Sequence, residues 1–70
     1  MHFGKIVKSY NYSQGLSAED LSAMLGRSVT EVLNLFEKKA WTHHDISAVS
    51  EAFNHDFLQY LENSYHYQNR

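Results

Sequence analysis

Hydrophobic residues recur along this chain three and four positions apart, which is the spacing of amphipathic α-helices. In one segment, for example, Val32, Leu35 and Phe36 fall on the same helical face. No proline, internal repeat or flexible linker interrupts the pattern. The sequence therefore predicts an all-α fold, a compact bundle of about five short helices.

Capping residues predict where the first two helices begin and end. We expect the first helix over residues 3–14, ended by Gly15, because glycine readily adopts the left-handed conformation at a helix C-terminus. Ser17 begins the second helix, with Asp20 placed to complete a short capping box. This helix lasts about two turns before Gly26 breaks it. Its predicted inward residues are Leu21, Met24 and Leu25.

The later helices follow the same logic. A Ser-x-x-Glu capping box starts the third helix at Ser28, and that helix is expected to run to about residue 38. Thr42 caps a fourth helix that ends near Asn54, and a fifth begins at Asp56. We expect a single domain over residues 1–64, followed by a frayed C-terminal tail at 65–70.

Composition narrows the possible functions. A chain of 70 residues has a small core. Because it contains no cysteine, disulfides and thiolate zinc sites cannot stabilise the fold. We therefore expect a partner subunit to stabilise it. No stretch approaches the roughly 20 apolar residues of a membrane span, and the first residues lack the apolar run of a secretory signal. We therefore expect a cytoplasmic protein that does not contact a membrane.

Catalysis and metal binding are not expected. Among the five histidines, His43 and His44 are adjacent and project about 100° apart on a helix, whereas metal-binding pairs favour a spacing of four residues. The chain also lacks a cysteine nucleophile, a glycine-rich phosphate loop and a Gly-x-Ser-x-Gly elbow. We predict no catalytic residue, no metal site, no cofactor and no small-molecule substrate.

The turn between the second and third predicted helices has the spacing of a DNA-binding helix-turn-helix. In a 20-residue unit counted from Ala18, the fifth, ninth, fifteenth and eighteenth residues are Ser22, Gly26, Val32 and Leu35. A small fifth residue lets the helices approach, and a glycine at the ninth supplies the positive φ of the turn. The two apolar residues anchor the second helix of the unit to the first.

Residues 16–39, LSAEDLSAMLGRSVTEVLNLFEKK, resemble the Cro-like and phage-repressor family of helix-turn-helix proteins, and the later run AFNHDFLQYL adds to the resemblance. It implies a lambda-repressor-like bundle whose third helix enters the major groove of double-stranded DNA, as a homodimeric transcriptional regulator. The residues implied to face bases are Ser28, Val29, Thr30, Leu33 and Asn34. Those implied to contact phosphates are Ser17, Arg27, Lys38 and Lys39.

The charge balance supports a second hypothesis. Between residues 17 and 41 the acidic residues, Glu19, Asp20, Glu31 and Glu37, outnumber the basic residues, Arg27, Lys38 and Lys39. This weakens the counterion release that drives DNA binding. An exposed Leu33 also suits a protein contact. The alternative is a helix-turn-helix-derived protein-interaction or dimerisation adaptor with little or no DNA binding.

The aromatic C-terminal segment predicts a contact between subunits. Leu58, Tyr60, Leu61 and Tyr65 are expected to pack against the same residues of a second chain across a two-fold axis. A competing interpretation is that these side chains cover the core of a monomer. Sedimentation at micromolar concentration separates the two, because a strictly monomeric mass would exclude the dimer.

Overall fold

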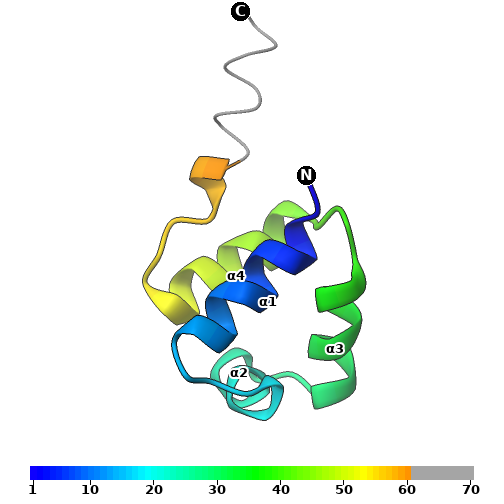
Figure 1. Cartoon of the computed structure of the whole chain (residues 1–70), viewed down its shortest axis with the longest axis vertical. Coiled ribbons are helices and arrows are strands. Elements are labelled where there is room, and N and C mark those ends of the chain that lie inside the picture. The colour runs from blue at the N-terminus through cyan, green and yellow to red at the C-terminus, as the bar shows by residue number, and fades with distance from the viewer. Residues whose placement is uncertain (61–70) are drawn as a thin grey trace, which may run out of the picture.

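The computed structural model describes residues 1–60 of the chain (Figure 1). Its helices are α1 (Phe3–Ser13), α2 (Ala18–Leu25), α3 (Val29–Glu37) and α4 (His43–Phe53). Residues 58–60 are also helical, and no strand occurs within residues 1–60. The predicted all-α class is therefore confirmed. The predicted tail at 65–70, and the dimer residues Leu61 and Tyr65, lie outside the described residues.

Both predicted capping boxes are present. The Asp20 amide donates to Ser17 Oγ at 3.1 Å, and the Ser17 amide donates back to Asp20 Oδ2 at 2.9 Å. Ser28 and Glu31 exchange the same pair of hydrogen bonds, each 3.1 Å long. Each box satisfies two amides at a helix start that have no partner within the helix. The short sequence signals thus define where α2 and α3 begin.

The predicted helix ends are also confirmed. Gly15 and Gly26 have φ values of +77° and +68°, and Asn54 adopts a left-handed conformation at φ +51°. This region of φ and ψ costs glycine nothing and asparagine little. The Thr42 hydroxyl accepts the Asp45 amide at 3.1 Å and caps α4 as expected.

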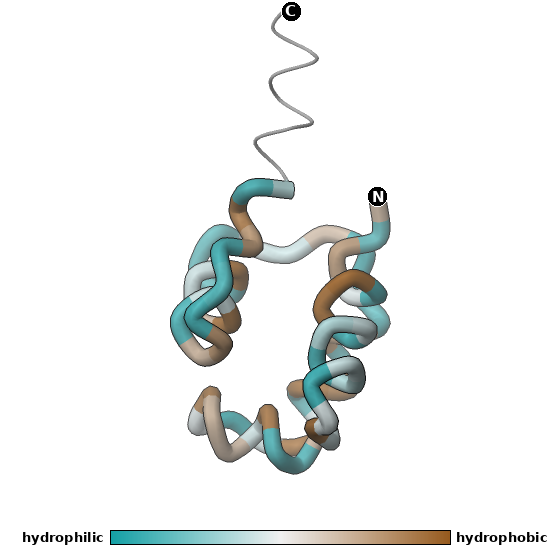
Figure 2. The backbone as a smooth tube through the Cα atoms, turned by 60° about the vertical axis from the view of Figure 1, so that its left-hand side comes forward, coloured by the Kyte–Doolittle hydropathy of each residue, from teal (hydrophilic) through white to brown (hydrophobic). Residues whose placement is uncertain are grey.

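The core is made by all four helices and by the segment after α4. In Figure 2 hydrophobic positions occur along each helix, between hydrophilic ones. The buried hydrophobic residues are Phe3, Val7, Leu21, Val32, Leu35, Phe36, Ile46, Val49 and Phe57. No helix within residues 1–60 is long and apolar enough to span a membrane.

The inward face of α2 differs from the prediction. Met24 is 42% exposed, so its assignment to the core is wrong. The buried residues of α2 are Leu21 and Ser22, and successive residues of a helix turn by about 100°, which leaves Met24 on the flank. The small side chain of Ser22 therefore takes the buried position on α2 that was predicted for Met24.

The start of α1 is fastened to the end of α3. The amides of Phe3 and Gly4 donate to the carbonyls of Lys39 and Lys38 at 2.8 and 3.0 Å. The first amides of a helix have no partner within the helix, and here the chain after α3 supplies one. Gly4 lies at the closest approach, because a Cβ added there would come within 2.6 Å of three carbonyl oxygens. This contact fixes α3 beside α1.

An aromatic cluster holds the segment after α4 against α1. The Phe57 ring is fully buried and lies 5.3 Å from the Tyr10 ring and 5.9 Å from the Phe53 ring, between centroids. The His55 ring stacks on Tyr10 at 4.5 Å, and its Nε2 hydrogen-bonds the Tyr60 hydroxyl at 3.1 Å. Residues 55–60 are therefore part of the folded unit.

Candidate functional site

The outer face of α3 carries most of the residues predicted to face DNA bases. Thr30 and Asn34 are exposed one helical turn apart, and Leu33 is 47% exposed beside them. Val29 is half-buried. Ser28 is exposed, but its hydroxyl is engaged in the cap with Glu31. The face thus offers one hydroxyl, one amide and one apolar side chain to an incoming partner, with the exposed Glu37 carboxylate at its C-terminal end.

This face is held rigidly by the opposite side of α3. Val32, Leu35 and Phe36 are buried in the core. At the N-terminal end of α3, a short turn at Gly26 connects this helix to α2, and the Arg27 amide closes the turn with a 3.0 Å hydrogen bond to the Ser22 carbonyl. Because both ends and one side are fixed, the exposed side chains of α3 project from a well-defined surface.

The residues predicted to contact phosphates do not all lie together, although Arg27 and Lys38 line one groove. Ser17 is half-buried and its hydroxyl caps α2. The side chains of Lys38 and Lys39 are exposed at the far end of α3, where their carbonyls bind the start of α1. Arg27 lies between α2 and α3 and makes an ion pair. The structure therefore does not gather these four residues into one cluster.

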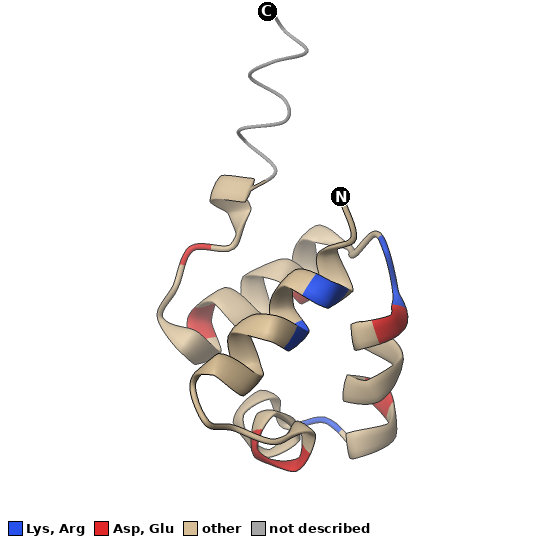
Figure 3. Cartoon of the chain, viewed as in Figure 1, with Lys and Arg blue, Asp and Glu red and all other residues tan. Residues whose placement is uncertain are grey.

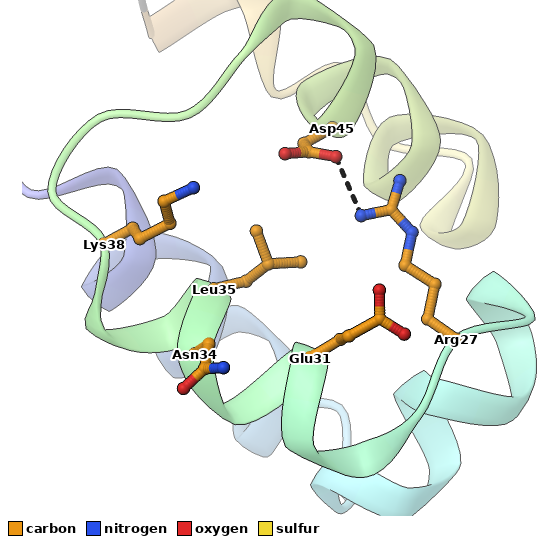
Figure 4. Close-up of a pocket in the computed structure, with 6 residues that line it drawn as sticks. All are labelled: Arg27, Glu31, Asn34, Leu35, Lys38 and Asp45. Carbon is orange, nitrogen blue, oxygen red and sulfur yellow. Dashed lines mark hydrogen bonds and ion pairs between the residues drawn. The ribbon is translucent and has the colours of Figure 1, made fainter.

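A groove beside α3 contains the Arg27 ion pair (Figure 4). Arg27 Nη1 donates to Asp45 Oδ1 at 2.8 Å, and the two side chains are 21% and 15% exposed. The residues lining the groove are Arg27, Glu31, Asn34, Leu35, Lys38 and Asp45. Two cations and two carboxylates share this surface, so it carries no net preference for an anion. The ion pair joins the α2–α3 turn to the first turn of α4.

The pairing of Arg27 with Asp45 does not follow from the sequence, in which Asp45 only completes the N-terminal turn of α4. Eighteen residues separate the two, so no local spacing rule connects them. Burial of the Asp45 carboxylate by itself raises its pKa, but hydrogen bonds from Arg27 and Thr42 and the charges of Arg27 and Lys38 outweigh burial. The pKa of Asp45 is therefore lower than its ordinary value.

This shift predicts a pH dependence of stability. Because the pKa of Asp45 is lower in the folded than in the unfolded chain, its stabilisation is complete above the ordinary value of about 4 and is lost as the pH falls through the folded value. In urea unfolding near pH 7, the free energy of unfolding of wild type should be higher than that of Asp45→Asn by up to about 1 kcal/mol. The difference should shrink toward about pH 2. An unchanging difference would contradict the assignment.

The histidines are dispersed, and no group of three or more potential ligands that could hold a metal ion occurs in the part of the chain that the structure describes. His43 and His44 are exposed in the first turn of α4. His2 has a role that the sequence did not reveal, because its Nδ1 accepts the Lys5 amide at 3.1 Å and caps α1. His55 belongs to the aromatic cluster.

Two of the predicted dimer residues contact the core of their own chain. Leu58 and Tyr60 are half-buried and pack against that core. The Tyr60 hydroxyl is already engaged by His55. Each still leaves part of its surface exposed, so the two-fold contact stays a prediction.

The exposed face of α3 is thus the best-defined candidate site, with a mixed-charge groove along one edge. Comparison with known protein families, with curated proteins and with solved structures finds no match. Function is therefore inferred from the side chains and geometry of the chain itself.

Proposed function

We propose that this protein is a sequence-specific DNA-binding transcriptional regulator that reads the major groove with α3. The observation that carries the proposal is the exposure of Thr30, Leu33 and Asn34 on a helix whose opposite side is locked in the core. α3 has nine residues, about 14 Å of helix, and the major groove is wide enough, at about 12 Å, to admit a helix.

The three side chains match groups that base pairs present in the major groove. The Asn34 amide can donate to and accept from one adenine, which is a bidentate contact. The Thr30 hydroxyl can hydrogen-bond several bases, and Leu33 can pack on a thymine methyl group. Together they favour recognition of a sequence containing A·T pairs.

Two of the four acidic residues between positions 17 and 41 are explained by the fold. The carboxylates of Asp20 and Glu31 accept hydrogen bonds from the N-cap amides of α2 and α3. Negative charge at a helix N-terminus is stabilised by the helix dipole. These two carboxylates therefore serve the capping boxes, and their presence does not by itself argue against a DNA partner.

A protein-interaction adaptor is the second candidate function, and the exposure of Leu33 favours it. A leucine that is 47% exposed among polar residues can supply the apolar centre of a small interface with a polar rim. Under that hypothesis Leu33→Asp would abolish partner binding, whereas loss of Lys38 or Lys39 would leave it unchanged.

Selection of bound fragments from a random duplex library at low salt tests the proposal. We expect one sequence to be enriched, and a palindromic site would support a homodimer. Against that sequence, Asn34→Ala should weaken binding by about 1–3 kcal/mol and relax the preference at one base pair.

Gln59→Ala is the matched control for this variant, because it removes another exposed amide from a position after α4. Its affinity should equal that of wild type. If no sequence is enriched, or if Asn34→Ala and Gln59→Ala lose equal DNA-binding affinity, α3 does not recognise DNA bases.

A further inference from the structure

The outer side of α1 carries a shallow concavity that the sequence analysis did not single out. It is lined by Lys5, Lys8, Ser9, Tyr12 and Ser13, so its charged and hydrogen-bonding side-chain groups are ammonium and hydroxyl groups, without a carboxylate, set among the apolar parts of the same side chains. Lysines and hydroxyl side chains are the groups that bind phosphate oxygens in protein–DNA complexes. The groove at Arg27, in contrast, includes two carboxylates that repel a phosphate.

The fold does not account for these two lysines. Lys5 is the third residue of α1, where the positive end of the helix dipole disfavours a cation, and no acidic residue occurs in that first turn. Both lysines are exposed. Within residues 1–60 the only ion pair joins Arg27 to Asp45, so neither lysine is neutralised by a described carboxylate. Their charge is available to a ligand.

Contacts toward both ends of α1 place the helix that carries this concavity beside α3. The Tyr12 ring, which is 49% exposed, lies 6.2 Å from the Phe36 ring of α3 between centroids. At the other end of α1, the Gly4 amide binds the Lys38 carbonyl. In Figure 3 the basic positions of α1 lie near the loop that follows α3, which carries the other two lysines. Lys5 and Lys8 are therefore exposed on a helix that packs alongside α3.

We propose that α1 is the phosphate-contacting flank of the DNA interface, with the backbone of one strand lying along Lys5 and Lys8 while α3 occupies the groove. This inference rests on the proposed function and deepens it. It assigns the main electrostatic contact to α1 and not to Arg27, whose guanidinium is already paired with Asp45.

Salt-dependent binding of a fluorescent random-sequence duplex to the full chain tests this assignment. Each phosphate contact contributes roughly 0.9 to the slope of log K against log salt. Lys5→Gln and Lys8→Gln should each lower that slope by about one and weaken binding several-fold on every sequence. Both variants should unfold at the wild-type temperature, because the side chains are exposed and unpaired within the described residues.

Gln59→Glu is the matched control, since it also lowers the net charge by one, at an exposed position that does not line the concavity. It should leave the salt slope unchanged. If wild type binds duplex DNA and selects a sequence, but both lysine variants behave like this control, the α1 assignment is wrong and the proposed function stands. If wild type binds no duplex DNA at any salt concentration, the proposed function fails and the α1 assignment fails with it.

Discussion

The Gly4→Ala variant is expected to lose most of the stability of the domain. Gly4 is buried in the first turn of α1, at the point where this helix crosses the end of α3. An added Cβ would lie 2.4 Å from the Phe36 carbonyl oxygen and 2.6 Å from those of Leu35 and Lys38. These are backbone atoms, so relief requires the two helices to separate.

The expected loss of stability in Gly4→Ala is the balance of two costs and one gain. Overpacking typically costs about 1–3 kcal/mol, and separation would also stretch the two hydrogen bonds from Phe3 and Gly4, each worth about 1 kcal/mol. The higher helix propensity of alanine compared with glycine offsets about 1 kcal/mol of this loss. A net loss of about 2–4 kcal/mol is a large fraction of the stability of so small a domain. Circular dichroism should record a fall in Tm of more than roughly 10 °C.

Gly15→Ala separates close packing from backbone conformation. A Cβ at Gly15 meets no atom within 4 Å, but the residue has a φ of +77°. The expected loss is therefore only the roughly 1–2 kcal/mol of a left-handed non-glycine residue. A third variant, Ser9→Ala, lies on the exposed side of α1 and should keep full stability. Wild-type stability in Gly4→Ala would contradict the described crossing of α1 and α3.

The helix boundaries could be predicted because their causes are local. Ser17 and Ser28 cap helices through bonds to residues three positions away, and Gly26 ends α2 by its own backbone preference. Such features need no knowledge of the rest of the fold. The exposed face of α3 was predictable for the same reason, since the spacing of Val32 and Leu35 places the opposite side outward.

Features that depend on the meeting of distant segments could not be predicted. The close approach at Gly4 and the pairing of Arg27 with Asp45 both join residues far apart in the sequence. Met24 has the helical spacing of a core residue. The packing of α3 and α4 around α2 nevertheless turns Leu21 and Ser22 toward the core instead. The family resemblance implies a phosphate contact for Arg27, but it does not reveal Asp45, the neighbour that folding brings to this guanidinium.

The two parts of the proposed interface differ in the same way, because one depends on local spacing and the other on contacts between distant segments. Sequence spacing identifies which side of α3 can meet a partner, because that follows from helix geometry. It does not identify the flank on α1, because Lys5 and Lys8 come to lie beside α3 only after the contacts at Gly4 and Phe36 form. Measurements on α1 and α3 together therefore test the fold and the proposed interface at once.

Replacing Phe57 with alanine is expected to have the other large effect. Phe57 follows α4 in a segment with little helix of its own, yet its side chain is fully buried. Its ring lies 6.2 Å from that of Phe3 and 5.3 Å from that of Tyr10, so it joins the C-terminal segment to both ends of α1. Removing the ring leaves a cavity among aromatic residues, which typically costs about 3–5 kcal/mol.

Urea unfolding followed by Trp41 fluorescence should report this loss, because the indole ring lies 5.1 Å from the Phe3 ring. If Phe57→Ala is unfolded without denaturant, Phe57→Leu keeps the assignment testable, since it preserves more volume and should remain folded with a smaller loss. Leu58→Ala is the matched control: its side chain is half-buried, so the cost should be less than half that of Phe57→Ala. Equal costs for the Phe57 and Leu58 truncations would mean that residues 55–60 do not dock on α1, and that the aromatic cluster does not belong to the core.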